Sequence, residues 1–252
     1  MMRAQNLCLG YGPLTVIDSV DVEIEPGQLT ALIGINGCGK TTLLRAFAGL
    51  HTPASGRVTG PAELPPIKRR DQLAYLPQRL PEGAHLTVKE LVVMSADAPN
   101  RWRASKAALE RADQALEQLE LSALRDRYCH HLSGGEYRRA ALAACLAQVT
   151  PWLILDEPCA GLDLYQSALL MRGLKEWLNA DSSRGALVVL HDLNLCAQWA
   201  DRCVVLSGGH IAASGSPEAV LTSDALSAAY GGTLQRFRHP ERDHLVVLGP
   251  QP

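Results

Sequence analysis

The chain has 252 residues, a formal net charge of −2 at pH 7 and a sequence pI near 6.4. This balance gives no sign of a polyanionic partner, so we expect neither nucleic acid nor an anionic membrane surface to bind it. The apolar run from Ala140 to Val149 is shorter than the roughly 20 residues that cross a bilayer, and the N-terminus lacks the apolar core of a signal peptide. Seven cysteines without a C-x-x-C pair indicate buried thiols in a reducing compartment. We therefore expect a cytosolic protein.

The predicted elements point to an α/β fold. The stretch "VDVEIEPG" alternates apolar and acidic residues before a Pro-Gly turn, which predicts a half-exposed strand. Residues 61–71 read as a surface loop, and a helix is predicted from about 104 to 124. Four runs are apolar on both faces and are therefore expected in the centre of a sheet covered on both sides: 29–34, 152–156, 186–191 and 203–206.

A glycine-rich loop follows the first of these buried strands. The run "GINGCGKTT", Gly34 to Thr42, fits G-x-x-x-x-G-K-[ST] and precedes a helical stretch, which is the context of a P-loop. Its backbone N–H groups would surround phosphates, Lys40 would place a cation on the terminal phosphates, and Thr41 would ligate Mg²⁺. The other interpretation is a glycine-rich turn with a chance lysine. The expected nucleotide contacts are Asn36, Gly37, Cys38, Gly39, Lys40, Thr41 and Thr42. Cys38 is expected to be neutral to function, although its thiol could open the site to alkylation.

An acidic pair ends the predicted strand at 152–156. In "WLILDEP", Asp156 is placed to hold the hydration shell of Mg²⁺. Glu157 points to the opposite side of the backbone and is expected to polarise an attacking water. The plain alternative is a solvated turn at the end of a strand.

The tetrapeptide LSGG occurs twice, in two different contexts. Ser133 and Glu136 form an S-x-x-E capping box before a helical stretch, whereas the copy containing Ser207 lies between two strand-like runs and reads as a hairpin turn. A helix N-terminus with a serine and two glycines suits a phosphate. Because the P-loop already takes this chain's nucleotide, we expect Ser133, Gly134 and Gly135 to face the γ-phosphate bound by a second copy.

In its order of motifs the chain resembles the nucleotide-binding subunits of ABC transporters over nearly its whole length. The resemblance implies a head-to-tail homodimer with two ATP molecules between the copies. It also implies that Tyr11 stacks on adenine, Gln78 contacts Mg²⁺ or water beside the membrane partner, Asp163 crosses the dimer seam and His191 contacts the γ-phosphate. Without the resemblance, these would read as structural or loop residues. Glu136 stands where glutamine is more usual, and "CAG" precedes Asp163, yet we expect a working ATPase.

Finer resemblance is to the ATPases of importers for ferric siderophores, haem and cobalamin. It lies in "LAYLPQ", "LTVKELV", "HDLNLCAQWADRCVVLSGGHIAASGSPEAVLT" and "LSAAYGGTLQRFRHP". Related ATPases of transporters for zinc, manganese or molybdate share much of this pattern. The segment "VMSADAPNRW" departs from the siderophore pattern near the expected membrane-subunit contact, which leaves the partner's identity open.

The resulting prediction is a single ABC ATPase domain spanning 1–252. A RecA-like P-loop NTPase core with an N-terminal antiparallel β subdomain covers 1–84 and 148–252, and an α-helical subdomain is inserted at 85–147. Integral membrane permease subunits would hold the chain at the inner face of the cell membrane, with a solute-binding protein acting indirectly. Two other classes stay open, a soluble ABC ATPase of DNA repair or translation and a P-loop kinase for a small molecule.

Overall fold

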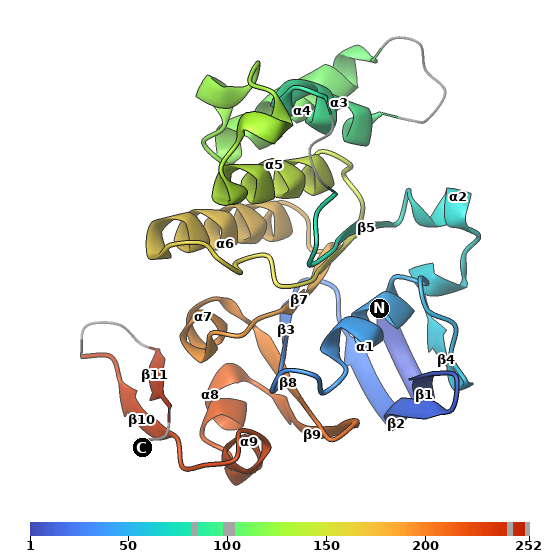
Figure 1. Ribbon diagram of the computed structural model, residues 1–252, viewed down its shortest axis with the longest axis vertical. Coiled ribbons are helices and arrows are strands. Elements are labelled where there is room, and N and C mark those ends of the chain that lie inside the picture. Colours follow the sequence, from blue (N-terminus) through green and yellow to red (C-terminus); the bar gives the residue numbers. More distant parts are fainter. Residues whose placement is uncertain (82–84, 98–103, 241–243, 250–252) are drawn as a thin grey trace.

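The computed structural model describes residues 1–81, 85–97, 104–240 and 244–249. Within these ranges, an antiparallel sheet in the order β2-β1-β4 lies at one side of the molecule (Figure 1). Its strands are β1 (Met2–Tyr11), β2 (Leu14–Ile24) and β4 (Ser55–Thr59). The predicted alternation is confirmed, because Val20, Val22 and Ile24 are buried while Asp21 is exposed.

The central sheet has the strand order β5-β6-β7-β3-β8-β9, in which only β9 pairs antiparallel. Every residue of β3, β6 and β7 is buried, as their apolar sequences predict for strands covered on both faces. The strands are β3 (Leu29–Ile33), β5 (Leu73–Leu76), β6 (Trp152–Leu155), β7 (Gly185–Val189), β8 (Arg202–Ser207) and β9 (His210–Gly215).

Two apolar cores lie on the two faces of this sheet. On one face, α1 (Lys40–Phe47) packs between the antiparallel sheet and the central sheet, with Phe47 fully buried. On the other face, the core takes in residues of α6 (Leu164–Asn179) and α7 (Leu193–Trp199) and continues into the helical region. Packing on both faces holds the central strands in place, and the site described below lies at the ends of these strands.

Three helices form a group of their own at one end of the molecule (Figure 1). They are α3 (Val88–Ala96), α4 (Lys106–Gln118) and α5 (Gly134–Leu146), with short 3-10 turns at η2 (Ser122–Leu124) and η3 (Cys129–His131). All lie inside the predicted insert, whose boundaries at 85 and 147 remain a prediction. The helix expected over 104–124 is shorter, because Ser105 caps its start and Glu120 has a positive φ of 53° beyond its end. Part of the divergent "VMSADAPNRW" segment lies outside the described residues.

Two further expectations have clear outcomes. The second LSGG copy is a hairpin turn between β8 and β9, with positive φ at Gly208 and Gly209, so this prediction is confirmed. The loop expected at 61–71 is wrong in part, because it contains η1 (Pro61–Glu63) and α2 (Pro66–Arg69). The Arg69 guanidinium orders the segment by donating hydrogen bonds to the carbonyls of Ala48, Gly49, Ala62 and Leu64.

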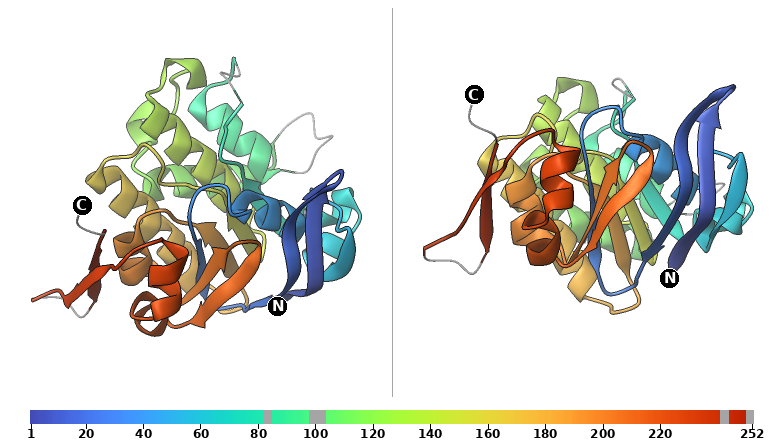
Figure 2. Two further views of the ribbon diagram at one scale, coloured as in Figure 1. Left: turned by 60° about the horizontal axis from the view of Figure 1, so that its bottom comes forward. Right: turned by 90° about the horizontal axis from the view of Figure 1, so that it is seen from below.

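The chain ends with two short helices and a hairpin, seen at the side of the molecule away from the antiparallel sheet (Figure 2). These are α8 (Pro217–Leu221), α9 (Asp224–Ala229), β10 (Gln235–Arg238) and β11 (Leu245–Leu248). The Asn194 side chain of α7 binds both the N–H and the carbonyl of Val247, which attaches the hairpin to the central sheet's helices.

Candidate nucleotide site

The site lies where four neighbouring strands end. The carboxyl ends of β5, β6, β7 and β3 share one edge of the parallel sheet, and that edge is where α/β sheets bind ligands. A cavity of about 330 Å³ opens there. Its lining comes from all four strand ends and from β2: Val16, Asn36, Gly37, Gly39, Lys40, Thr41, Thr42, Gln78, Glu157 and His191.

The loop after β3 has the backbone geometry of a phosphate-binding turn. Gly39 has φ 104° and caps the N-terminus of α1, and a Cβ at this position would lie 2.8 Å from Ile17 Cδ1. The Lys40 Nζ donates hydrogen bonds to the carbonyls of Gly34 and Ile35, both at 2.8 Å, so its cation stays beside the loop. The Cys38 thiol is buried and its pKa is raised by burial, which argues against alkylation at this position.

Asp156 lies at the end of β6 with its side chain fully buried, and neither carboxylate oxygen has a hydrogen-bond partner among the described residues. Burial raises the pKa of Asp156, and the negative charge of Glu157 adds to this, while the nearby Thr41 hydroxyl and Lys40 act in the opposite direction. A buried carboxylate that lacks a well-formed hydrogen bond is costly. Oxygen donors of this kind suit a hard divalent cation, so Asp156 and Thr41 fit a Mg²⁺ ion.

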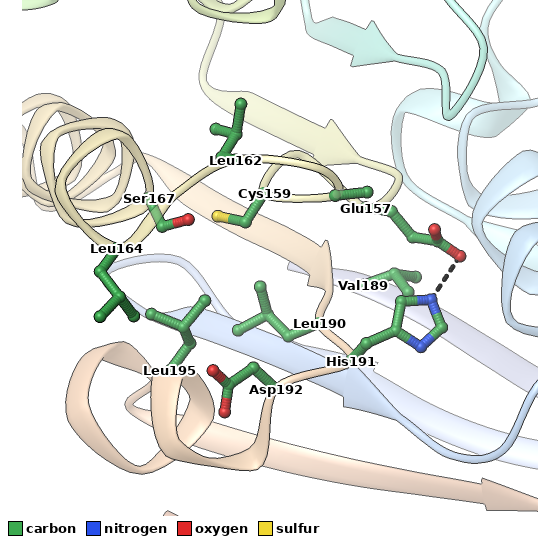
Figure 3. Close-up of a pocket in the computed structure, with 11 residues that line it drawn as sticks. Glu157, Cys159, Leu162, Leu164, Ser167, Val189, Leu190, His191, Asp192 and Leu195 are labelled. Carbon is green, nitrogen blue, oxygen red and sulfur yellow. Dashed lines mark ion pairs between the residues drawn. The ribbon is translucent and has the colours of Figure 1, made fainter. Parts of the chain in front are cut away.

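Glu157 is held at both carboxylate oxygens. Its Oε1 pairs with Nε2 of His191 (Figure 3), at a distance of 2.5 Å. Its Oε2 accepts a hydrogen bond of 2.8 Å from Nε2 of Gln78. Its backbone has φ 52°, in the left-handed region that costs a non-glycine residue roughly 1–2 kcal/mol. The side chain is 14 % exposed. The carboxylate thus stands at the cavity wall with a fixed orientation.

One residue at this site was not predicted from the sequence. Arg138 of α5 donates from one guanidinium nitrogen to the carbonyl oxygen of Glu157, at 2.6 Å, and from the other to the carbonyl oxygen of Gln78, at 3.0 Å. The one sequence signal that points to this residue is the pair Arg138-Arg139, which follows the glycines of the first LSGG copy. Of the two, Arg139 is buried in the helical core and donates to the carbonyl of Leu119.

The residues of the first LSGG copy do not line this cavity. Ser133 caps α5 by accepting a hydrogen bond from the Glu136 N–H at 3.3 Å, while Glu136 accepts from the Ser133 N–H at 2.7 Å, which confirms the predicted capping box. The Ser133 N–H lowers the pKa of Glu136. A Cβ on Gly134 would meet nothing within 4 Å, whereas one on Gly135 would meet Gln166. The helix start therefore faces open space at Gly134.

The two remaining predicted residues lie at the margins of the site. Asp163 caps α6, where its carboxylate accepts a hydrogen bond of 2.8 Å from the Gln166 N–H. Tyr11 ends β1 and is 48 % exposed, with its hydroxyl 3.5 Å from Thr42 Oγ1 and its ring centroid 4.8 Å from that of His51. Its exposure shows that it is not a core residue.

A second cavity of about 240 Å³ adjoins the first behind Glu157 and His191. Figure 3 shows the Cys159 and Ser167 side chains within it and the Glu157–His191 pair at its edge. Burial raises the pKa of Cys159 to about 12, so this thiol is not a nucleophile near neutral pH.

A P-loop facing an acidic pair across the strand ends defines a P-loop nucleotide-binding protein. Residues 17–160 match the family model described as ABC transporter. The chain belongs to the ABC transporter family, in which it is an ATP-binding and ATP-hydrolysing subunit with the cassette fold. None of the helices that the structure describes is both long and apolar enough for a transmembrane span.

Relatives with similar sequences carry names from haem and siderophore transport. The hemin import ATP-binding protein HmuV of Nocardia farcinica is 39% identical over 269 residues, covering 98% of this chain and 88% of that protein. YusV of Bacillus subtilis, named a probable siderophore transport system ATP-binding protein, is 38% identical over 247 residues, covering 95% and 89%.

Solved structures of similar fold include a dimer and a transporter. The dimeric bacterial ABC transporter cassette MJ0796 has a TM-score of 0.78 and 26% identity, covering 86% of this chain and 99% of that one. A structure described as a metal-chelate type ABC transporter in an inward-facing conformation has a TM-score of 0.81 and 25% identity, covering 98% and 97%.

Proposed function

We propose that this chain is the ATP-hydrolysing motor of an importer for a metal chelate, with haem or a ferric siderophore as the solute. The observation that carries the proposal is the identity of 39% and 38% to HmuV and YusV over almost the whole chain. The likeness to a metal-chelate type transporter supports the same solute class. Cobalamin, also a metal chelate, is the next candidate.

The chemistry follows from the four strand ends. The P-loop N–H groups and Lys40 bind the phosphates of ATP, and Thr41 and Asp156 hold Mg²⁺. When bound, Mg²⁺ neutralises charge on the phosphate oxygens. Glu157 orients a water molecule and accepts its proton as the water attacks the γ-phosphorus, and the bond to the β-phosphate oxygen breaks to leave ADP and phosphate.

Gln78 and His191 act on this reaction through Glu157. Their side chains approach the two oxygens of its carboxylate at 2.8 and 2.5 Å, which supports a role in aiming it at the water. His191 is 40 % exposed at the cavity and is also placed to reach the γ-phosphate. We assign both residues to the catalytic set on these contacts.

A second copy completes each site in this proposal. Ser133, Gly134 and Gly135 lie at the N-terminus of α5, away from this chain's own cavity, with open space over Gly134. Beside Asp163, the residues Leu164 and Tyr165 are 86% and 64% exposed, which suits a surface that a partner covers. The dimer of MJ0796 supports this arrangement. Tyr11 would stack on the adenine of its own chain's ATP.

The proposal also includes a membrane partner. Integral membrane permease subunits would hold it at the inner face of the cell membrane, and a solute-binding protein would deliver the chelate. Gln78 follows β5, its carbonyl oxygen accepts a hydrogen bond from Arg138 of the helical group, and its side chain contacts Glu157. The permease would therefore reach the catalytic carboxylate through this residue. Nucleic acid has no place in the proposal.

The test is purification of the tagged chain from detergent-solubilised host membranes, followed by reconstitution of the complex in vesicles. We expect a multi-span permease to co-purify and ATP to drive uptake of haem or a ferric siderophore, with no uptake by the Lys40→Ala complex. Uptake of cobalamin alone would change the solute within the class. Uptake of free zinc or manganese ions only, or recovery of soluble partners or nucleic acid only, would contradict the proposal.

A further inference from the structure

The guanidinium of Arg138 connects the helical group to the catalytic carboxylate within one chain. It projects from α5 and donates to the carbonyl oxygens of Glu157 and Gln78, which follow two different strands of the sheet. The Gln78 side chain in turn donates to the Glu157 carboxylate. These three hydrogen bonds form a closed ring, so none of the three residues can shift without disturbing the other two.

The contact with Glu157 falls on a strained backbone. Glu157 has φ 52°, a conformation that persists only where its surroundings enforce it. The bond of 2.6 Å from Arg138 to its carbonyl oxygen is charge-assisted, and such bonds are among the stronger ones in proteins. The planar fork of arginine suits two acceptors at once, whereas lysine presents a single point charge.

We propose that Arg138 is a positioning residue for hydrolysis, which holds the backbone of Glu157 and Gln78 so that the Glu157 carboxylate faces the water. This inference rests on the role proposed above for Glu157. Since Arg138 belongs to α5, displacement of the helical group relative to the sheet would move the catalytic carboxylate. Arg138 therefore links hydrolysis to the position of the part of the chain that would contact the permease.

The chain offers a matched control in Arg111 of α4. Its guanidinium also bridges two carbonyl oxygens, those of Ala147 and Ala96, but it does not contact Glu157 or Gln78. Loss of either arginine removes two hydrogen bonds to backbone carbonyl oxygens, so we expect similar losses of stability. Only loss of Arg138 should alter the geometry of the catalytic carboxylate.

The experiment compares single-turnover hydrolysis at saturating MgATP, affinity for a fluorescent ATP analogue and thermal stability. We expect Arg138→Ala to slow hydrolysis by about tenfold to a hundredfold at nearly unchanged nucleotide affinity. The rate of Arg138→Lys should lie between those of Arg138→Ala and the original protein. Arg111→Ala should keep a hydrolysis rate within about twofold of that of the original protein. If Arg138→Ala does not fold, the hydrolysis rate of Arg138→Lys is compared with that of Arg111→Ala instead. Equal losses in Arg138 and Arg111 variants, or a rate within twofold for the Arg138 variants, would overturn the proposal.

A second arm separates this inference from the role of Glu157. In a Glu157→Gln background, Arg138→Ala should lower the residual rate no further, because a residue that acts through the carboxylate has nothing left to position. An equal loss in both backgrounds would overturn the inference. If Glu157→Gln alone kept normal turnover, the proposed role of Glu157 would fail instead.

Discussion

The Nε2 of His191 lies 2.5 Å from the Oε1 of Glu157, which joins the carboxyl ends of β7 and β6. The two residues are far apart in sequence, and parallel pairing of their strands brings them together. With Gln78 on the other oxygen, the Glu157 carboxylate has one orientation, into the cavity that the P-loop lines. Preorganisation of this kind is what a water-activating group needs.

Replacement of Glu157 by glutamine tests its role as the proton acceptor. The change keeps the size of the side chain and its hydrogen bond with Gln78 but removes the basic carboxylate. Turnover should fall by about two orders of magnitude or more, while MgATP still binds and a dimer accumulates. Phosphate release and size-exclusion chromatography measure the two effects. Near-normal turnover would remove Glu157 from this role.

The two LSGG copies should respond differently to the same change. Ser133→Tyr places a large side chain where a second copy's phosphate is expected, so hydrolysis should be abolished, whereas Ser207→Tyr should alter only the stability of the β8–β9 hairpin. Hydrolysis and thermal unfolding measure these effects.

Ser133 also caps α5, and loss of a cap costs about 1 kcal/mol. Ser105 is the matched control, because its side chain caps α4 by accepting a hydrogen bond from the Ala108 N–H. Ser105→Tyr should therefore lower the free energy of unfolding without abolishing hydrolysis. Equal loss of activity in the folded Ser133 and Ser207 variants would show that the copies are wrongly assigned.

The buried carboxylate of Asp156 should destabilise the fold when Mg²⁺ is not bound. Its pKa is raised above 3.8, so the folded chain binds this proton more tightly than the unfolded chain does. The free energy of unfolding therefore falls as the pH rises from about 3.8 to the raised pKa, and stays lowered above it. Each unit by which the pKa is raised lowers the free energy of unfolding by about 1.4 kcal/mol. In a chain of this size, each kcal/mol of that loss lowers Tm by roughly 2–4 °C.

Asp156→Asn removes that titration. Without nucleotide the variant should be more stable than the original by a margin that grows across this pH window, yet it should hydrolyse ATP poorly and gain less stability from MgATP. Urea unfolding from about pH 4 to pH 8, with and without MgATP, measures this. An identical pH dependence in both proteins would show that Asp156 carries no such penalty.

The local motifs were the most predictable parts of the fold and the site. The P-loop, the Ser133 capping box and the turn at Gly208 and Gly209 each depend on a few consecutive residues, and the structure has all three. The buried strands were predictable for a similar reason, since residues apolar on both sides belong inside a covered sheet.

Contacts between distant segments were not predictable. The bridge from Arg138 to Glu157 and Gln78 depends on how α5 packs against two strand ends, which no local pattern encodes. The turns at 61–71 depend in the same way on Arg69 reaching four carbonyl oxygens. Burial of Cys38 is likewise a result of packing, which a glycine-rich sequence does not reveal.

The central claim is that two copies share each ATP site, and a mixing experiment tests it most directly. Lys40→Ala removes the P-loop cation and Ser133→Tyr blocks the helix start, so each variant alone should be inactive. In a head-to-tail pair of the two, one site receives both changes and the other receives neither, so an equal mixture should recover about a quarter of the original ATPase activity. A mixture that forms mixed dimers with MgATP but stays as inactive as either variant would contradict the shared site.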